Sequence, residues 1–381
     1  MNEILILSAS RTAVGSLNGA LANSTAPQLG SKAAADALAK SGVKPEELGE
    51  VVLGCVISAG VGQAPARQAA IGAGIPVSVG ATTVNKVCGS GMKAVMLASQ
   101  SIALGEEDYA LAGGMESMSK APFLLDKARS GYRYGDAKLL DAILKDGLMD
   151  PYDGVHMGDC GELCAREHGI TRAMQDDYAV KSYQRALEAQ AKGVFKSEIV
   201  AVDGVDVDEE PGRAKLDKVS KLRPAFQKDG TITAANASKL NDGAAALILS
   251  SAKGAAGRKP LARVAGWATH CQEPKWFTTA PAGAVESLLK KTGWTKDSVD
   301  LFEVNEAFAV VPLAVMKLAG LPHEKVNVHG GAVALGHPLG ASGARILVTL
   351  INALKIRGAK RGVAAICLGG GEAVAVALEL V

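Results

Sequence analysis

The sequence predicts an α/β protein that is built from two similar halves. Short apolar runs alternate with longer alanine-rich amphipathic segments, which is typical of strands that alternate with helices. The second part of the chain repeats the order of the first part, and both share a short motif at the start of one helix. Of 381 residues, 48% are hydrophobic and 21% are charged, which suits about two to three domains with a large core.

The first half is expected to form a mainly parallel sheet with helices between its strands. Four strands are followed by a fifth after a long interruption: Ile4–Ser8, Val51–Val56, Ala81–Asn85, Tyr109–Ala112 and Ala244–Leu249. The helical patterns between the first four are Leu29–Lys40, Ala64–Ala73 and Gly91–Leu104. Strands that alternate with helices in this way favour parallel pairing.

The second half follows the same order. The expected strands are Ala262–Ala268, Leu301–Val304, Lys325–Val328, Ala364–Leu368 and Ala373–Glu379. The expected helices are Ala282–Thr292, Ala309–Leu318 and Gly343–Ile356. Only a glycine turn separates the last two strands, so we expect them to pair in antiparallel fashion.

A local motif supports a duplicated fold. Gly89-Ser90-Gly91 opens one helix and Ala341-Ser342-Gly343 opens its counterpart, and each helix is followed by a strand and paired glycines. The segment between the strands of the first half has no counterpart in the second, so we interpret it as an insertion that carries binding loops. The expected boundaries are 1–117 with 244–254, then 118–243, then 255–381.

Composition excludes several classes of function. The chain has 41 basic and 39 acidic residues, a net charge of +2, which gives no basis for a nucleic-acid partner or an anionic membrane partner. Six cysteines are too few for a disulfide scaffold and indicate free thiols in a reducing compartment. No charge-free apolar run has the length of a membrane span, and the start of the chain resembles a strand rather than a signal peptide. Cytoplasm is therefore the expected location.

Reactive side chains gather at the ends of the expected strands. Cys88 directly precedes a helix, where unpaired N–H groups and the helix dipole favour a thiolate. His337 lies in a glycine-rich loop before another helix and is a candidate base for that thiol. Cys367 is followed by three glycines, whose N–H groups could bind an oxyanion. Each residue taken alone is also compatible with a structural role: a buried thiol, a packed histidine or a loop.

Taken together, these blocks resemble the active-site motifs of thiolases. The four blocks are Asn85-Lys86-Val87-Cys88-Gly89-Ser90-Gly91, Asn305-Glu306-Ala307-Phe308-Ala309, Gly336-His337-Pro338-Leu339-Gly340-Ala341-Ser342-Gly343 and Cys367-Leu368-Gly369-Gly370-Gly371. The resemblance covers essentially the whole chain in the right order. It implies a five-layer αβαβα fold of two pseudo-symmetric halves with an inserted loop domain.

The resemblance also implies a chemistry. Cys88 would attack an acyl-CoA thioester while His337 accepts its proton, and Cys367 would move the α-proton of a second acetyl-CoA. One thioester oxygen would be held by Asn305, through a water, and by His337. The backbone N–H groups of Cys88 and Gly369 would hold the other. The expected activity is acetyl-CoA C-acetyltransferase, with no cofactor and no metal.

Substrate binding is expected mainly in the insertion. The resemblance places Ser238 at the pantetheine arm of CoA, and His156 and Met157 near the acyl group, with Phe308 as a further substrate-binding residue. Arg213 is the nearest candidate for the CoA phosphate, although a solvated surface arginine is the better interpretation. The family also implies a homodimer or a homotetramer.

Some residues depart from the thiolase pattern. Lys239 stands where glycine is common, so we expect an effect on the affinity for CoA. Glu372 stands where a neutral residue is common, so we expect an electrostatic effect on Cys367, unless Glu372 points to solvent. The segment Pro274–Pro281 leaves chain-length preference open, and a degradative 3-ketoacyl-CoA thiolase is the alternative. A non-catalytic acyl-CoA-binding protein is a weaker one.

A metal site is a competing interpretation of the insertion. Four residues of suitable type recur at every fourth position: His156, Cys160, Cys164 and His168. Steps of four drift by roughly 40° around an α-helix, so one helix offers only neighbouring pairs to an ion. We therefore expect no metal there.

Overall fold

The computed structural model describes residues 2–381 and confirms an α/β fold in two pseudo-symmetric halves. The elements of the first half are β1 (Ile4–Thr12), β2 (Gly15–Ser16), α1 (Ala26–Ser41), β3 (Glu50–Gly54), α2 (Pro65–Gly72), β4 (Gly80–Val84), α3 (Ser90–Leu104), β5 (Tyr109–Ser117) and β9 (Asn241–Ser251). Those of the second half are β10 (Ala262–Cys271), α7 (Ala280–Thr292), β11 (Leu301–Val304), α8 (Val310–Ala319), α9 (Ala332–Leu335), α10 (Leu339–Arg357), β12 (Arg361–Leu368) and β13 (Glu372–Leu380).

The elements pack in five layers around one continuous sheet of eleven strands. The part that contains β1, β3, β4, β5 and β9 and the part that contains β10 to β13 form two layers of the molecule, and they are named the first and the second sheet. Helices α1 and α2 cover the outer face of the first sheet, and an apolar core of alanine, leucine and valine fills that contact. Helices α3 and α10 pack against each other between the two sheets, where the largest apolar cluster lies. Helix α7 and its neighbour α8 cover the outer face of the second sheet. The central layer therefore brings the first turns of α3 and α10 together.

The two central helices are also the most apolar long helices of the described chain. Val87–Leu104 and Leu339–Arg357 are long and apolar enough to cross a membrane, but 61% and 89% of them are buried inside the protein. Their place between two sheets accounts for their composition, because a helix that is covered on all sides must be apolar all round.

The expectation of a mainly parallel sheet was wrong at the centre of the fold. Strand order is β11-β12-β13-β10-β1-β9-β5-β3-β4. The ladders at the two edges are parallel, whereas every ladder from β12 through to β5 is antiparallel. A strand that is buried on both faces shows a continuous apolar run whether it pairs in parallel or in antiparallel fashion. The sequence pattern therefore did not reveal that β9 returns between β1 and β5.

The strand expected at Lys325–Val328 is absent as a strand. Val326 makes a single parallel bridge with Phe302, after which the backbone leaves the sheet at Asn327 with φ 49°. The side chain of Asn327 takes over the pairing: its Oδ1 accepts from Val304 N–H at 2.8 Å and its Nδ2 donates to Val304 O at 2.8 Å. At this edge of the second half, the side-chain amide of Asn327 therefore takes the place that strand β4 takes in the first half.

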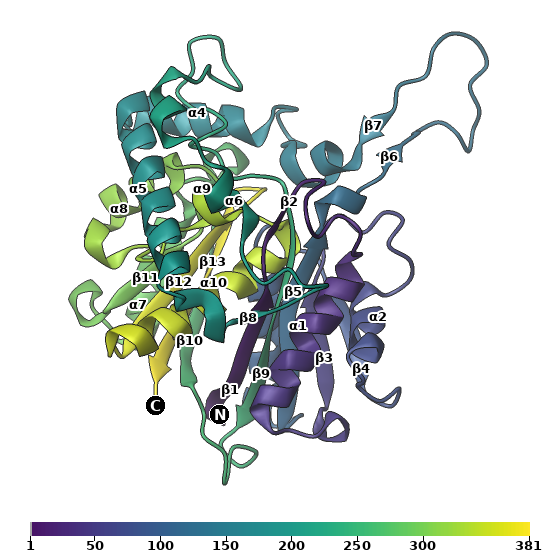
Figure 1. Cartoon of the computed structure of the whole chain (residues 1–381), viewed down its shortest axis with the longest axis vertical. Coiled ribbons are helices and arrows are strands. Elements are labelled where there is room, and N and C mark those ends of the chain that lie inside the picture. The colour runs from purple at the N-terminus through teal and green to yellow at the C-terminus, as the bar shows by residue number, and fades with distance from the viewer. Residues whose placement is uncertain (1) are drawn as a thin grey trace.

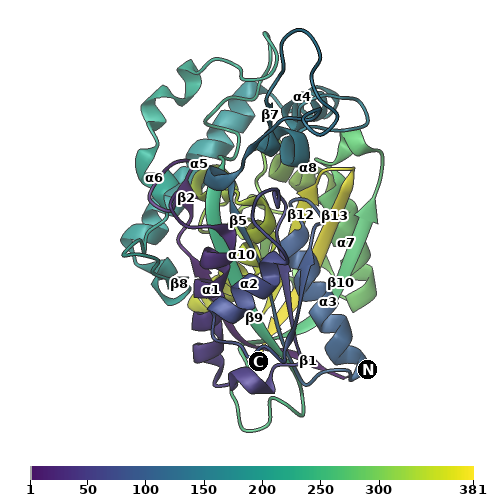
Figure 2. The same cartoon turned by 90° about the vertical axis from the view of Figure 1, so that its right-hand side faces the viewer.

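The inserted segment occupies mostly the end of the molecule opposite the two termini (Figures 1 and 2). Its elements are β6 (Phe123–Leu124), β7 (Leu140–Asp141), α4 (Met157–Glu167), α5 (Arg172–Ala191), β8 (Ile199–Val200) and α6 (Glu209–Arg213). A buried ion-pair network anchors it to β1: Arg11 contacts Glu198 at 2.6 Å and Asp208 at 2.7 Å. Helix α4 of the insertion begins beside the loop after β12, because Met157 Cε would lie 3.8 Å from a Cβ at Gly369.

Candidate active site

Cys88 lies in a tight turn between β4 and α3. Val87 adopts the left-handed conformation with φ 46°, which is strained for a β-branched residue. The Ser90 hydroxyl stabilises the turn, because it accepts from Lys86 N–H at 2.8 Å and donates to Val87 O at 2.6 Å. The thiol is only 9% exposed.

The electrostatics of Cys88 differ from the sequence expectation. Burial raises the pKa of the Cys88 thiol to about 12, and the nearby carboxylate of Glu116 adds to the effect. N–H groups of Cys88 and Gly369 contact the sulfur and act in the opposite direction. The helix N-terminus is present, but desolvation outweighs it. The resting group is a protonated thiol that needs a base.

His337 is held as a neutral base. The Ser342 hydroxyl donates to Pro338 O at 2.9 Å, so its oxygen must accept the proton of His337 Nδ1, which lies 2.6 Å away. That assignment leaves a lone pair on Nε2, which is buried and has no partner within residues 2–381. Burial, with a smaller contribution from Arg345, lowers the pKa of His337 to about 3.

Asn305 and Cys367 complete the set of four. Asn305 follows β11 and is 1% exposed, and neither atom of its side-chain amide has a partner among the described residues. An unsatisfied buried amide is costly unless a ligand or water fills the place. Cys367, near the end of β12, is fully buried. Burial raises its pKa well above that of a free thiol, and the negative charge of Cys88 raises it further, so the two cysteines are neighbours.

Glycines allow the loops of the two halves to meet. A Cβ added at Gly89 would lie 2.5 Å from Leu368 Cδ2, so the Cys88 turn packs directly on the side chain of the last residue of β12. A Cβ at Gly340 would lie 2.5 Å from Met115 O, where α10 begins against β5. Only glycine permits such close approach of two backbones.

Glu116 is a site residue to which sequence reasoning assigned no role. This fully buried carboxylate accepts from the N–H groups of Gly340 at 2.9 Å, Val56 at 3.1 Å and Ile57 at 3.2 Å. Burial raises its pKa to about 7 while these N–H groups act to lower it. It joins the start of α10 to the loop after β3. The sequence signal was its place in Gly113-Gly114-Met115-Glu116, directly after paired glycines.

The expected substrate residues converge on an aromatic group above Cys367. The ring of His156 stacks on Phe226 with centroids 4.6 Å apart, and Phe226 meets Phe308 edge to face at 5.9 Å. Met157 packs in the same cluster as Phe308 and Cys367. Phe226 was missed, because a single aromatic residue in a charged loop carries no pattern.

Ser238 is placed beside this group by backbone pairing. Its N–H donates to Ala307 O at 2.9 Å, and Ala237 forms an antiparallel bridge with Phe308. A groove continues outward from Ser238 as two adjoining cavities of about 370 and 270 Å³. Residues of the second cavity include Lys215 and Lys218, which carry positive charge at its rim.

The two side chains that depart from the family pattern both have partners. The Lys239 ammonium folds back to donate to Ala237 O at 2.6 Å and Val333 O at 3.3 Å, and burial lowers its pKa to about 8. Glu372 pairs with Lys86, and it is not among the groups that shift the pKa of Cys367. Arg213 is a largely exposed residue whose nearest charged partner is Glu209 at 3.7 Å.

The residues considered as zinc ligands do not form a cluster. His156 caps the N-terminus of α4 and stacks on Phe226, while Cys160 and Cys164 face the apolar core. Within residues 2–381, no group of three or more histidine, cysteine, aspartate or glutamate side chains is placed to hold a metal ion.

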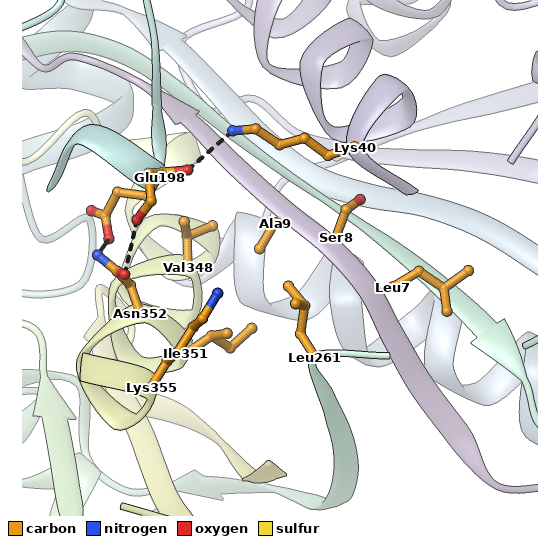
Figure 3. Close-up of a pocket in the computed structure, with 11 residues that line it drawn as sticks. Leu7, Ser8, Ala9, Lys40, Glu198, Leu261, Val348, Ile351, Asn352 and Lys355 are labelled. Atoms are coloured by element: carbon orange, nitrogen blue, oxygen red, sulfur yellow. Dashed lines mark hydrogen bonds between the residues drawn. The ribbon is translucent and has the colours of Figure 1, made fainter. Parts of the chain in front are cut away.

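A separate cavity of about 240 Å³ lies between β1, α1 and α10 (Figure 3). It is lined by none of the expected site residues. Two of the three charged residues that line it have protein partners: Lys40 donates to Ser197 O at 3.1 Å, and Glu198 accepts from Asn352 at 2.8 Å, while Lys355 is the third (Figure 3). These contacts tie the insertion to α10 and give the cavity a structural role.

Comparison with known proteins assigns the family. The N-terminal domain of thiolases matches residues 4–253, and the C-terminal domain of thiolases matches residues 258–380. The chain therefore belongs to the thiolase family.

Individual relatives are similar over their full length. Acetyl-CoA acetyltransferase 2 of Arabidopsis thaliana is 52% identical over 99% of this chain and 97% of its own length. The cytosolic acetyl-CoA acetyltransferase ERG10 of Gibberella zeae is 49% identical over 99% of this chain and 98% of its own. The crystal structure of Acat5 thiolase from Ascaris suum in complex with coenzyme A superposes with a TM-score of 0.96 at 45% identity and covers all of both chains.

Proposed function

We propose that this thiolase is an acetyl-CoA C-acetyltransferase. It condenses two molecules of acetyl-CoA to acetoacetyl-CoA and CoA, and it catalyses the reverse thiolysis. The Arabidopsis and Gibberella relatives carry this name at about half identity over their full length. Two observations support the mechanism: the buried Cys88 thiol has the N–H groups of Cys88 and Gly369 at its sulfur, and the buried imidazole of His337 has a free Nε2.

The first step transfers an acetyl group to Cys88. His337 Nε2 takes the thiol proton, and the thiolate attacks the thioester carbon. The N–H groups of Cys88 and Gly369 then stabilise the oxyanion that forms, and each such donor contributes roughly 3 to 4 kcal/mol. The C–S bond to CoA breaks, and the proton held by His337 goes to the departing CoA sulfur.

The second step forms the carbon–carbon bond. Cys367 first gives its own proton to His337 Nε2, and the Cys367 thiolate then removes a proton from the α-carbon of the second acetyl-CoA. The resulting enolate attacks the acetyl carbon on Cys88, the C–S bond to Cys88 breaks, and the Cys88 thiolate takes the proton that His337 holds. Asn305, through a water, and His337 hold the enolate oxygen, which is consistent with the unpaired amide of Asn305. No cofactor is needed in this scheme, because the thioester itself activates both carbons.

Substrate contacts follow from the same arrangement. His156, Met157 and Phe308 border the acyl group, and Ser238 contacts the pantetheine arm. The CoA phosphates would follow the groove toward Lys215 and Lys218. The packed aromatic group limits room for a long acyl chain, which favours the four-carbon product.

Two experiments test the proposal. After incubation with acetyl-CoA, peptide mass spectrometry should find an acetyl thioester on Cys88; its absence argues for the non-catalytic binding protein. Values of kcat/KM across 3-ketoacyl-CoA substrates should be highest for acetoacetyl-CoA. A rise with longer chains would instead support a degradative 3-ketoacyl-CoA thiolase.

We further propose a homodimer or homotetramer in the cytoplasm. Strand β4 lies at the edge of its sheet with exposed positions along it. The hairpin that contains β6 and β7 extends away from the body (Figure 1) and exposes Phe123, Tyr134 and Leu139. Exposed edges and apolar residues of this kind are typical of contacts between subunits.

A further inference from the structure

An ion pair joins the catalytic loops of the two halves. Lys86 stands two residues before Cys88, and Glu372 follows the three glycines after Cys367. Their charged groups are in contact, and their side chains are 23% and 29% exposed. The pair therefore lies at the edge of the site, where water reaches it only partly.

Each partner is rigidly connected to a group of the oxyanion site. The backbone of Lys86 is fixed by Ser90 and bridges to Cys88. Glu372 opens β13, pairs with Leu368 across the hairpin, and accepts a further hydrogen bond from the Cys271 thiol at 3.4 Å. A shift of either side chain thus carries its own loop with it.

The loop after β12 is held at Gly371 but not at Gly370. Gln272 N–H donates to Gly371 O at 2.9 Å, and a Cβ at Gly371 would lie 2.4 Å from Gln272 O. Gly370 and Gly371 both have positive φ, at 91° and 80°, and a Cβ at Gly370 would meet nothing within 4 Å. The neighbouring contact between the two loops is apolar, Gly89 against Leu368. This apolar contact keeps the two segments from moving closer together, but it does not stop one from sliding along the other. A pair of opposite charges favours one relative position of the two segments.

We propose that Lys86 and Glu372 are positioning residues, which hold the Gly369 N–H against the Cys88 sulfur by fixing the two loops relative to each other. This rests on the proposed roles of Cys88 and Gly369. An oxyanion donor must lie within a few tenths of an ångström of its place to be effective. A partly exposed ion pair adds little to stability, so its effect should fall on the rate of chemistry.

Four variants of the full-length enzyme test this: Lys86→Gln, Glu372→Gln, the double variant, and the exchanged pair Lys86→Glu with Glu372→Lys. We expect each single variant to lower kcat about three- to tenfold, with KM for acetyl-CoA within about twofold, because an oxyanion donor is displaced while the substrate still binds. The kcat of the double variant should equal that of either single variant, and it should not fall by the product of the two single effects. The exchanged pair should recover most of the parent kcat.

A matched control separates this effect from the removal of any surface charge. Arg258 and Glu47 form an ion pair of similar exposure, 24% and 34%, away from the site. Glu47→Gln should leave kcat unchanged. Thermal melting should confirm that every variant is folded.

The rate of the acyl-enzyme burst provides a second readout, and it should fall in parallel with kcat. The proposal is overturned if the single variants keep the parent kcat, if their effects multiply, or if the exchanged pair recovers nothing. Any of these results leaves the thioester on Cys88 intact, so the proposed function is tested separately by its own experiment.

Discussion

The two halves use equivalent serines for different purposes. Ser90 and Ser342 each lie in the first turn of a central helix, and each hydroxyl donates to a backbone carbonyl just upstream. In the first half the hydroxyl also accepts from Lys86 N–H and closes the turn that presents Cys88. In the second half it accepts from His337 Nδ1. The Ser90 hydroxyl therefore shapes the loop of Cys88, the proposed nucleophile, and the Ser342 hydroxyl selects the tautomer of His337, the proposed base.

Burial also acts in opposite ways on the two loops. It raises the pKa of Cys88 to about 12 and lowers that of His337 to about 3. Both groups are therefore neutral at rest, with the proton on sulfur. In the proposed mechanism, a proton transfer from Cys88 to His337 forms an ion pair when the substrate stabilises it.

The largest expected effect is at the nucleophile. Cys88→Ala should lower the rate of acetoacetyl-CoA thiolysis by at least about a thousandfold, because no acyl-enzyme forms without the sulfur. Steady-state kinetics measure this, and the thermal midpoint serves as control. Full activity in this variant would refute the mechanism.

The next largest effect is expected at Ser342, whose hydroxyl sets the tautomer of His337. Ser342→Ala removes the acceptor for His337 Nδ1–H, so the proton can move to Nε2 and block the base. The value of kcat should fall about ten- to hundredfold, with KM nearly unchanged. Ser99→Ala is the matched control, since Ser99 is a buried helical serine without a hydrogen-bond partner within residues 2–381. An equal decrease in kcat for both variants would show that Ser342 does not act through the tautomer of His337.

Acid should destabilise the fold through His337. A histidine whose folded pKa is lowered to about 3 from 6.5 binds its proton on unfolding, so falling pH favours the unfolded chain. Between these two pKa values, His337 should lower the free energy of unfolding by up to about 1.4 kcal/mol for each unit that the pH falls. Denaturant unfolding of the parent and of His337→Asn should show a shallower pH dependence in the variant. Identical slopes would mean that His337 does not stay neutral.

The smallest effect concerns the aromatic group. Phe226→Ala removes the stacking partner of His156 and the edge contact with Phe308. We expect KM for acetoacetyl-CoA to rise about three- to tenfold and longer 3-ketoacyl-CoA substrates to gain relative kcat/KM. Ile356→Ala, an exposed apolar position in the last turn of α10, provides the control. An unchanged chain-length profile would show that Phe226 does not border the acyl group.

Much of this could be predicted from local pattern. The alternation of strands and helices, the duplicated helix start, the placement of Cys88 and Cys367 near strand ends and that of His337 before a helix are short-range features. The direction of β9 and the absence of a strand at Lys325–Val328 were not predicted, because both depend on partners far away in sequence. The same holds for Glu116, whose three donors come from two distant loops.

The sequence by itself determined the elements and the residue types that the chemistry needs. Local sterics and hydrogen bonding account for three of these features: glycine where two segments approach closely, serine at the starts of the two central helices, and a thiol beside a glycine turn. Only the tertiary structure decided their protonation and their pairing. The pKa of Cys88 is high because the folded core excludes water more effectively than a helix N-terminus stabilises charge. The contact between Lys86 and Glu372 exists because folding brings together loops that are far apart along the chain.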